Sequence, residues 1–157
     1  EDSLSDLYAS LEGIAQKKNI QLKVDCHLDE SLILGDIAKF ERIVQNLIEN
    51  AIHYTPEQGT VTLAAFNTNN QIRVEISDTG QGISEEDLPY IFEPYYRSKN
   101  ALKPYEKGTG LGLAICQRLL ELHNSQLQVT STLQQGTCFF FDLEITNETD
   151  NNTDLSS

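Results

Sequence analysis

The sequence predicts a two-layer α/β fold, in which a mixed and mostly antiparallel sheet is covered on one face by helices. Segments in which apolar and polar residues alternate, as in strands with one buried face, occur between segments whose apolar residues have helical spacing. These helical and strand-like segments follow one another in mixed order. The length of 157 residues suits one domain with a substantial core.

The first helix is expected over about residues 3–18, with an apolar face made of Leu4, Leu7, Leu11 and Ile14. A strand follows, because apolar residues alternate with polar ones at Ile20, Leu22 and Val24. Gly35 and Asp36 then break and cap the chain into a second helix, which ends at Thr55 and Pro56.

The second helix carries the first candidate site residues. Its apolar residues fall on one face: Ile37, Phe40, Ile43, Val44, Leu47, Ile48, Ala51 and Ile52. Asn46, Asn50 and Tyr54 recur every four residues beside that face, so their side chains are expected to form one polar stripe. An amide oxygen suits Mg²⁺, and Asn50 with help from Asn46 is therefore a candidate metal ligand. An asparagine pair taken alone is more often a solvated polar surface.

Two further strands form an expected hairpin and lead to a candidate base-binding residue. Their apolar positions are Val61, Leu63 and Ala65, then Ile72, Val74 and Ile76, with a polar turn at residues 67–70. The second strand delivers Asp78, followed by Thr-Gly-Gln-Gly. A carboxylate there accepts from the exocyclic amine of adenine and repels the carbonyl oxygen of guanine. Asp-Thr-Gly also occurs in aspartic proteases, but a second such triad is missing.

A long polar segment, residues 93–109, is broken by Pro94 and Pro104 and is expected to form a mobile lid over ATP. Ser84 is expected to cap a short helix before it, and Phe92 to anchor its base. Arg97 is a candidate for neutralising charge on a transferring phosphoryl group, with a weaker claim for Lys107, although a loop arginine is more commonly a plain surface residue.

A glycine-rich run opens the last expected helix, residues 111–123, so free N–H groups and the positive helix dipole can face phosphate oxygens. This run, residues 108–113, follows a polar loop rather than a strand and lacks the Gly-Lys-Ser/Thr end of a P-loop. The last two strands are expected at 126–132 and 137–145, and a disordered polar tail at 146–157.

Composition limits the classes of partner. Acidic residues outnumber basic ones by 24 to 11, and the net charge of −13 argues against a nucleic-acid partner. An acidic chain that binds a triphosphate needs local neutralisation, so Mg²⁺ is expected.

The sequence also argues against zinc, a disulfide framework and a membrane-spanning segment. No CxxC spacing occurs among its three cysteines, which are Cys26, Cys116 and Cys138. The chain shows neither an 18-residue apolar run nor a signal-peptide pattern and opens on Glu1, so we expect a piece of a longer protein without direct membrane contact.

Together the motifs resemble those of sensor histidine kinases. QNLIENAIHYT is similar to the N box, DTGQG to the G1 box, FEPYYR to the F box, GTGLGLAI to the G2 box and GTCFFF to the G3 strand. The resemblance covers about residues 3–145 and implies the Bergerat-type fold of the kinase, gyrase, Hsp90 and MutL group. It implies an ATP-binding catalytic domain at 1–145, the tail at 146–157, and ATP and Mg²⁺ as cofactors.

The resemblance also implies residue roles. Asn50 ligates Mg²⁺ with help from Asn46, Asp78 reads adenine, and Arg97, with Asn46 and Lys107, acts in phosphoryl transfer to histidine. The residues implied to contact the nucleotide are Asn46, Asn50, His53, Tyr54, Asp78, Gly80, Gly82, Ile83, Phe92, Tyr96, Arg97, Gly108, Thr109, Gly110, Leu111, Gly112, Leu113 and Thr137.

Two departures from the family pattern have consequences. His53 stands where many members place a phosphate-contacting lysine, which makes charge neutralisation there weaker and pH-dependent. None of His27, His53 and His123 lies in the phosphoacceptor pattern, a helical His followed by Glu or Asp and by Pro four residues later. The resemblance therefore implies a separate, dimerising domain that bears the histidine, a response regulator beyond it, and a cytoplasmic location even if the parent kinase is membrane-anchored.

Two other functions stay open. A hydrolase of the same fold would carry a glutamate at the place of Asn46 to activate water, which an amide cannot do. Glu49 is not four residues before Asn50 and would point off the polar stripe. The second alternative is a nucleotide-binding or scaffolding module without chemistry, although none of the motifs looks degraded.

Overall fold

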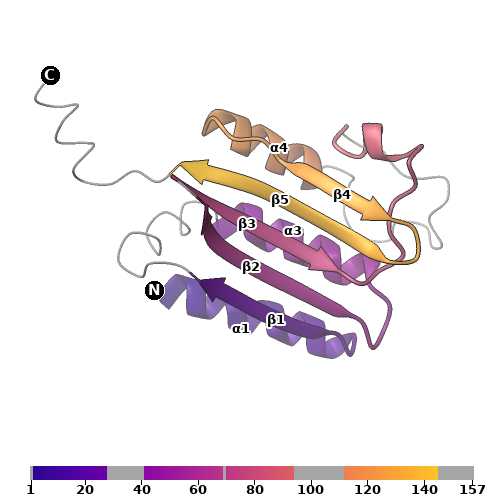
Figure 1. Cartoon of the computed structure of the whole chain (residues 1–157). Coiled ribbons are helices and arrows are strands. Elements are labelled where there is room, and N and C mark those ends of the chain that lie inside the picture. Colours follow the sequence, from indigo (N-terminus) through magenta and orange to yellow (C-terminus); the bar gives the residue numbers. More distant parts are fainter. Residues whose placement is uncertain (1, 28–40, 69, 94–111, 145–157) are drawn as a thin grey trace, which may run out of the picture.

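The computed structural model describes residues 2–27, 41–68, 70–93 and 112–144 (Figure 1). The elements in chain order are α1 (Asp2–Lys17), β1 (Gln21–His27), α3 (Glu41–Tyr54), β2 (Thr60–Thr68), β3 (Gln71–Asp78), the 3-10 helix η1 (Leu88–Tyr90), α4 (Gly112–Leu122), β4 (Gln128–Thr132) and β5 (Gly136–Glu144). The expected cap at Asp36, most of the expected lid and the tail at 146–157 lie outside the described residues.

The five strands form one mixed sheet in the order β1-β2-β3-β5-β4. β1 pairs with β2 in parallel, and the other three pairings are antiparallel. The helices α1, α3 and α4 all lie behind the same face of this sheet (Figure 1). The predicted two-layer architecture is therefore confirmed.

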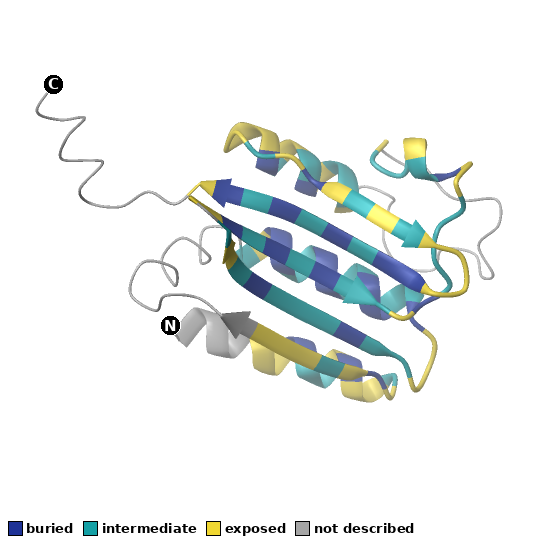
Figure 2. Cartoon of the chain, viewed as in Figure 1, coloured by how far each residue is buried: buried dark blue, intermediate teal, exposed yellow. Residues whose placement is uncertain are grey.

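The core lies between the helices and the facing side of the sheet. α3 buries Ile43, Val44, Leu47, Ile48, Ala51 and Ile52, which is the apolar face expected from its helical spacing within the described part of the helix. Buried residues alternate along the central strands, as Figure 2 shows, and they include Ile72, Val74, Ile76, Phe139, Phe141 and Leu143. The alternation in the sequence thus predicted which side of each strand faces the helices.

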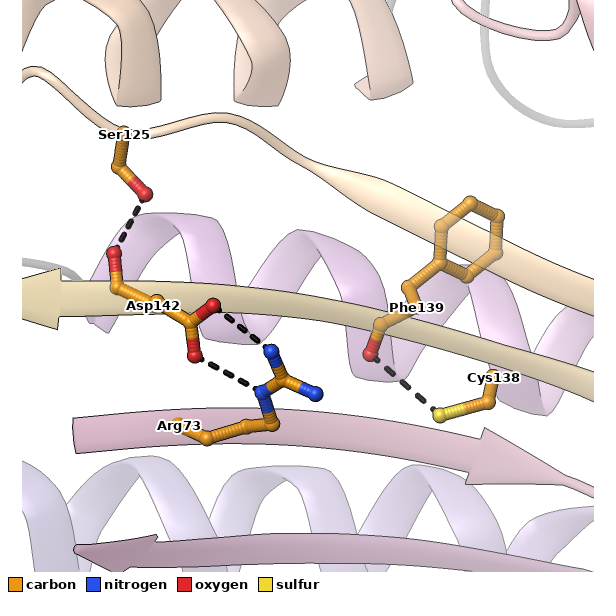
Figure 3. A network of polar contacts seen from close by, with 5 residues as sticks. All are labelled: Arg73, Ser125, Cys138, Phe139 and Asp142. Atoms are coloured by element: carbon orange, nitrogen blue, oxygen red, sulfur yellow. Dashed lines mark hydrogen bonds and ion pairs between the residues drawn. The ribbon is translucent and has the colours of Figure 1, made fainter. Parts of the chain in front are cut away.

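The other face of the sheet is held together by its own side chains (Figure 3). Arg73 on β3 stands opposite Asp142 on β5, and two N–H groups of its guanidinium donate to the two carboxylate oxygens at 2.8 and 2.8 Å. The same guanidinium lies 4.7 Å from the centre of the Phe140 ring. Ser125 Oγ donates to the backbone carbonyl of Asp142 at 2.6 Å, which ties the start of the β4 segment to the end of β5.

Two local expectations differ from the structure. The hairpin is tighter than expected, because β2 continues to Thr68 and β3 begins at Gln71. The short helix expected after Ser84 is instead a turn followed by the three-residue η1. Ser84 does bond Asp87, accepting from its N–H at 3.3 Å. A regular α-helix capped by Ser84 would place Pro89 beyond its first turn, where proline lacks the N–H that would donate to the Glu85 oxygen.

Replacement of Phe141 tests the core. Phe141 is fully buried in β5, so Phe141→Ala should lower the free energy of unfolding by about 3–5 kcal/mol in urea denaturation. Leu133→Ala is the matched control, because Leu133 is 52% exposed in the β4–β5 turn, and its effect should stay within about 0.5 kcal/mol. Equal effects of the two substitutions would contradict the placement of the core.

Candidate functional site

The predicted polar stripe lies beside the buried face of α3. Asn46, Asn50, His53 and Tyr54 are all half-buried, whereas their apolar neighbours on the helix are fully covered. The His53 and Tyr54 rings meet edge to face, with centroids 4.9 Å apart and planes at 87°. The last two turns of α3 thus present amides and aromatic rings along one partly accessible side.

The end of α3 meets the end of β3 through a glycine. A Cβ on Gly80 would lie 2.7 Å from the backbone oxygen of Tyr54 and 2.9 Å from Oδ1 of Asp78. Both distances are shorter than real Cβ contacts, so only glycine permits this approach. Gly80 therefore brings two predicted site residues, Tyr54 from the helix and Asp78 from the strand, to the same place.

The Asp78 carboxylate is half-buried and fixed by backbone donors. It accepts from the N–H of Gly80 at 2.8 Å and from the N–H of Thr137, its neighbour across the β3–β5 pairing. Burial raises the pKa of Asp78 above the ordinary aspartate value, and these two hydrogen bonds partly oppose the shift. A carboxylate accepts about four hydrogen bonds, so two backbone donors leave capacity for a ligand.

A hydroxyl pair supports the loop that follows Asp78. The hydroxyls of Thr137 and Ser131 are 2.8 Å apart, and Ser131 Oγ also accepts from the N–H of Ile83 at 2.7 Å. Gly82 adopts a φ of +77°, and a Cβ there would lie 2.3 Å from the oxygen of Thr132. The β4–β5 hairpin therefore fixes the path of residues 81–83.

Asn46 is tied to α4. The Cys116 thiol is buried, lies 3.9 Å from the Ile43 carbonyl oxygen and is hydrogen-bonded by the side chain of Asn46. Burial raises the pKa of Cys116 to about 11, and the Asn46 bond partly opposes the shift. The thiol is therefore an uncharged packing group that holds α4 against the first predicted asparagine.

Other predicted site residues are only partly placed. Phe92 packs against the core, with its ring centre 6.3 Å from that of Phe139, and Leu113 packs against the same core. Gly112 begins α4, and a Cβ on it would meet no heavy atom within 4 Å. The remaining predicted residues, Tyr96, Arg97, Lys107, Gly108, Thr109, Gly110 and Leu111, lie outside the described residues.

Sequence reasoning missed the supporting residues Ser131 and Cys116. Strand alternation places Ser131 on β4, but only the pairing of β4 with β5 sets it opposite Thr137. Cys116 belongs to the buried side of α4, and its contact with Asn46 depends on how two distant helices pack. The Cys116 contact has no local sequence signal, and the Ser131–Thr137 pair, six residues apart, depends on the register of the β4–β5 hairpin.

A family model described as histidine kinase-, DNA gyrase B-, and HSP90-like ATPase matches residues 35–147. The chain belongs to this family. It is 37% identical over 131 residues to the adaptive-response sensory kinase SasA of Gloeothece citriformis. The matched region covers 83% of this chain but only 33% of that relative. The chain thus spans well under half the length of the curated relatives it matches.

Solved structures show the same fold. The nucleotide-free catalytic domain of histidine kinase ThkA is 27% identical, with a TM-score of 0.73, and the match covers 90% of each chain. The full-length kinase ShkA in complex with AMPPNP gives a TM-score of 0.77 at 28% identity, over 92% of this chain and 30% of that one. The expected Bergerat fold of the ATP-binding domain of sensor histidine kinases is therefore confirmed.

The raised pKa of Asp78 predicts a pH-dependent stability. Because the pKa of Asp78 is higher in the folded chain than in the unfolded one, protonation of this carboxyl group stabilises the fold. This contribution is fully present below about pH 4 and is lost as the pH rises through the folded-state pKa. Asp78→Asn cannot ionise at this position. The free energy of unfolding of the variant minus that of the unaltered chain should therefore increase as the pH rises from about 4 to about 7. Urea unfolding across this range measures the difference, and a constant or opposite trend would contradict the burial of this carboxylate.

Proposed function

We propose that this chain is the ATP-binding catalytic domain of a two-component sensor histidine kinase. It transfers the γ-phosphoryl group of Mg-ATP to a histidine on a separate dimerisation domain, from which the group passes to a response regulator. The observation that carries the proposal is the Asp78 carboxylate, held half-buried by the Gly80 and Thr137 N–H groups beside the end of α3. Family membership and the likeness to kinase catalytic domains support it.

The carboxylate of Asp78 selects adenine. Its remaining acceptor capacity suits the exocyclic amine of adenine, whereas guanine has a carbonyl oxygen at that place. Gly80 allows the backbone of Tyr54 to approach the carboxylate, because a Cβ there would lie 2.7 Å from the Tyr54 oxygen and 2.9 Å from Asp78 Oδ1. Tyr54 and His53, at the same end of α3, supply aromatic rings near the base.

The stripe on α3 suits a hard cation bound with the phosphates. Asn50 is half-buried one turn beyond Asn46, and each side-chain amide has an oxygen of the kind that Mg²⁺ binds. Bound Mg²⁺ would neutralise charge on the phosphate oxygens, which this acidic chain otherwise repels. The tie between Asn46 and Cys116 keeps the first amide at a fixed place against α4.

The local chemistry favours phosphoryl transfer over hydrolysis. Asn46 is an amide and cannot take a proton from water. The nearest carboxylate on the helix, Glu49, accepts from Gln45 Nε2 at 3.0 Å, so it is engaged one turn back along α3. A same-fold hydrolase is the alternative that this arrangement disfavours, and a scaffolding module without chemistry is the other outcome of the tests below.

Transfer requires groups beyond the described residues. Arg97, and more weakly Lys107, are proposed to neutralise the transferring phosphoryl group, with Tyr96 contacting the nucleotide and Gly108 and Gly110 shaping the lid. We place the domain in the cytoplasm, where a response regulator would meet it. Among the described helices, none has the length and apolar character needed to cross a bilayer.

Replacement of Asp78 tests the adenine role. Asp78→Asn removes a charge-assisted hydrogen bond and should weaken ATP binding by about 1.5–3 kcal/mol in calorimetric titration. The same substitution should narrow the preference for ATP over GTP, because the repulsion of the guanine carbonyl is lost. Unchanged ATP affinity in a folded variant would refute the role of Asp78.

Transfer itself is tested with an added histidine-bearing dimerisation domain and ATP labelled at the γ-phosphoryl group. We expect acid-labile label on the added domain. Arg97→Ala should slow the labelling by about 100-fold or more while leaving ATP affinity nearly unchanged. Arg118→Ala, which alters an exposed arginine on α4, is the matched control. Release of free phosphate without labelling of the added domain would favour a hydrolase. Binding of ATP with neither hydrolysis nor labelling would favour a nucleotide-binding module.

A further inference from the structure

The turn between α1 and β1 contains a lysine that reaches a different helix. Lys18 directly follows α1, and its Nζ donates to the backbone oxygens of Ile52 at 3.0 Å and of His53 at 2.7 Å. Both carbonyls belong to the last turn of α3, past the end of the regular helical hydrogen-bond ladder, where the Ile52 oxygen also accepts from the Thr55 N–H at 3.3 Å. A cation at this end of a helix also interacts favourably with the helix dipole. Lys18 is therefore a C-terminal cap supplied by another element.

The turn that presents Lys18 is itself well defined. The N–H groups of Lys18 and Ile20 both donate to the oxygen of Ala15, at 3.1 and 2.9 Å, and Asn19 adopts a φ of 58°. Ala15 and Ile20 are buried in the core. The ammonium is thus carried by a closed turn anchored on both sides, and α1 lies beside α3 behind the sheet (Figure 1).

Two backbone hydrogen bonds join the same turn to the connection between α3 and β2. The N–H of Gln58 donates to the oxygen of Asn19 at 2.9 Å, and the N–H of Gln21 donates to the oxygen of Gly59 at 3.0 Å. Directly after α3, Thr55 Oγ1 donates back to the oxygen of Ala51 in the helix at 2.7 Å. The α1–β1 turn is therefore bonded to the α3–β2 connection through the backbone. It is bonded to α3 itself through the side chain of Lys18.

We propose that Lys18 is a positioning residue for the base-binding end of the nucleotide site. By capping α3 it fixes the backbone of His53 and Tyr54, and the next carbonyl, that of Tyr54, lies against Gly80 and hence beside Asp78. The inference rests on the proposed function, because it names a group that prepares the same ATP site. The residue that follows α1 therefore helps to fix the geometry of the proposed adenine pocket.

Without the ammonium, the last turn of α3 loses its cap and frays. His53 and Tyr54 then sample positions away from Gly80, and adenine binding must supply the free energy that orders them. The expected result for Lys18→Met is an ATP dissociation constant raised by about 3- to 30-fold. Lys18→Arg keeps a cationic donor and should recover most of the affinity.

The control is Lys17→Met, which removes the same charge one residue earlier, at an exposed position on α1. ATP dissociation constants of the unaltered chain and the three variants are measured by calorimetry under conditions where urea unfolding shows each to be fully folded. Amide hydrogen exchange at Thr55, whose N–H donates to the Ile52 oxygen, reports the last turn of α3 directly. A purely structural role would lower the urea midpoint and leave the dissociation constant of the folded protein unchanged.

The outcomes separate this inference from the proposed function. Weaker ATP binding and faster exchange at Thr55 in Lys18→Met, with Lys17→Met unchanged, support the positioning role. Tight binding by all variants overturns the role of Lys18 and leaves the ATP site intact. Absence of ATP binding by the unaltered chain overturns both. If Lys18→Met does not fold, Lys18→Gln, which keeps a neutral donor, takes its place and is expected to raise the ATP dissociation constant by a smaller factor.

Discussion

The half-buried carboxylate of Asp78, held by two backbone N–H groups where β3 leaves the sheet, is the constraint around which the proposed site is arranged. Burial makes the charged form costly, which is why the pKa of Asp78 is raised. The Gly80 and Thr137 donors offset part of that cost and aim the carboxylate at the same time. The charged form of Asp78 therefore lowers the stability of the fold, but the carboxylate is already oriented to accept a hydrogen bond from a ligand. Such a loss of stability is typical of binding sites.

The two layers of the fold, which pack against each other along the core, also meet beside this carboxylate. The sheet supplies Asp78 and Thr137 from paired strands, and the helical layer supplies the end of α3, which touches the sheet residues through Gly80. Lys18 and Cys116 hold α3 from either side, one at its last turn and the other beside Asn46. The polar stripe of α3 is therefore placed by contacts with α1, α4 and β3 together. Its position is a property of the whole fold rather than of the helix alone.

Much of this arrangement could be predicted from the sequence. Strand alternation and helical spacing identified the buried faces, and the Asp78 motif located the end of β3, because both signals are local and periodic. The supporting contacts of Lys18 with Ile52, of Ser131 with Ile83 and of Cys116 with Ile43 could not be predicted in this way, since each joins elements that are far apart in sequence. The helix expected after Ser84 was wrong for a local reason, because Pro89 favours the short 3-10 turn. The roles of Arg97 and Lys107 stay predictions.

Calorimetric titration of the unaltered chain with ATP, with and without Mg²⁺ and with GTP for comparison, tests the central claim most directly. The account predicts binding of ATP that Mg²⁺ strengthens and much weaker binding of GTP, because Asp78 reads the base and the α3 asparagines bind the metal with the phosphates. Equal binding of both nucleotides would contradict the role of the carboxylate, and no binding of either would contradict the ATP site as a whole.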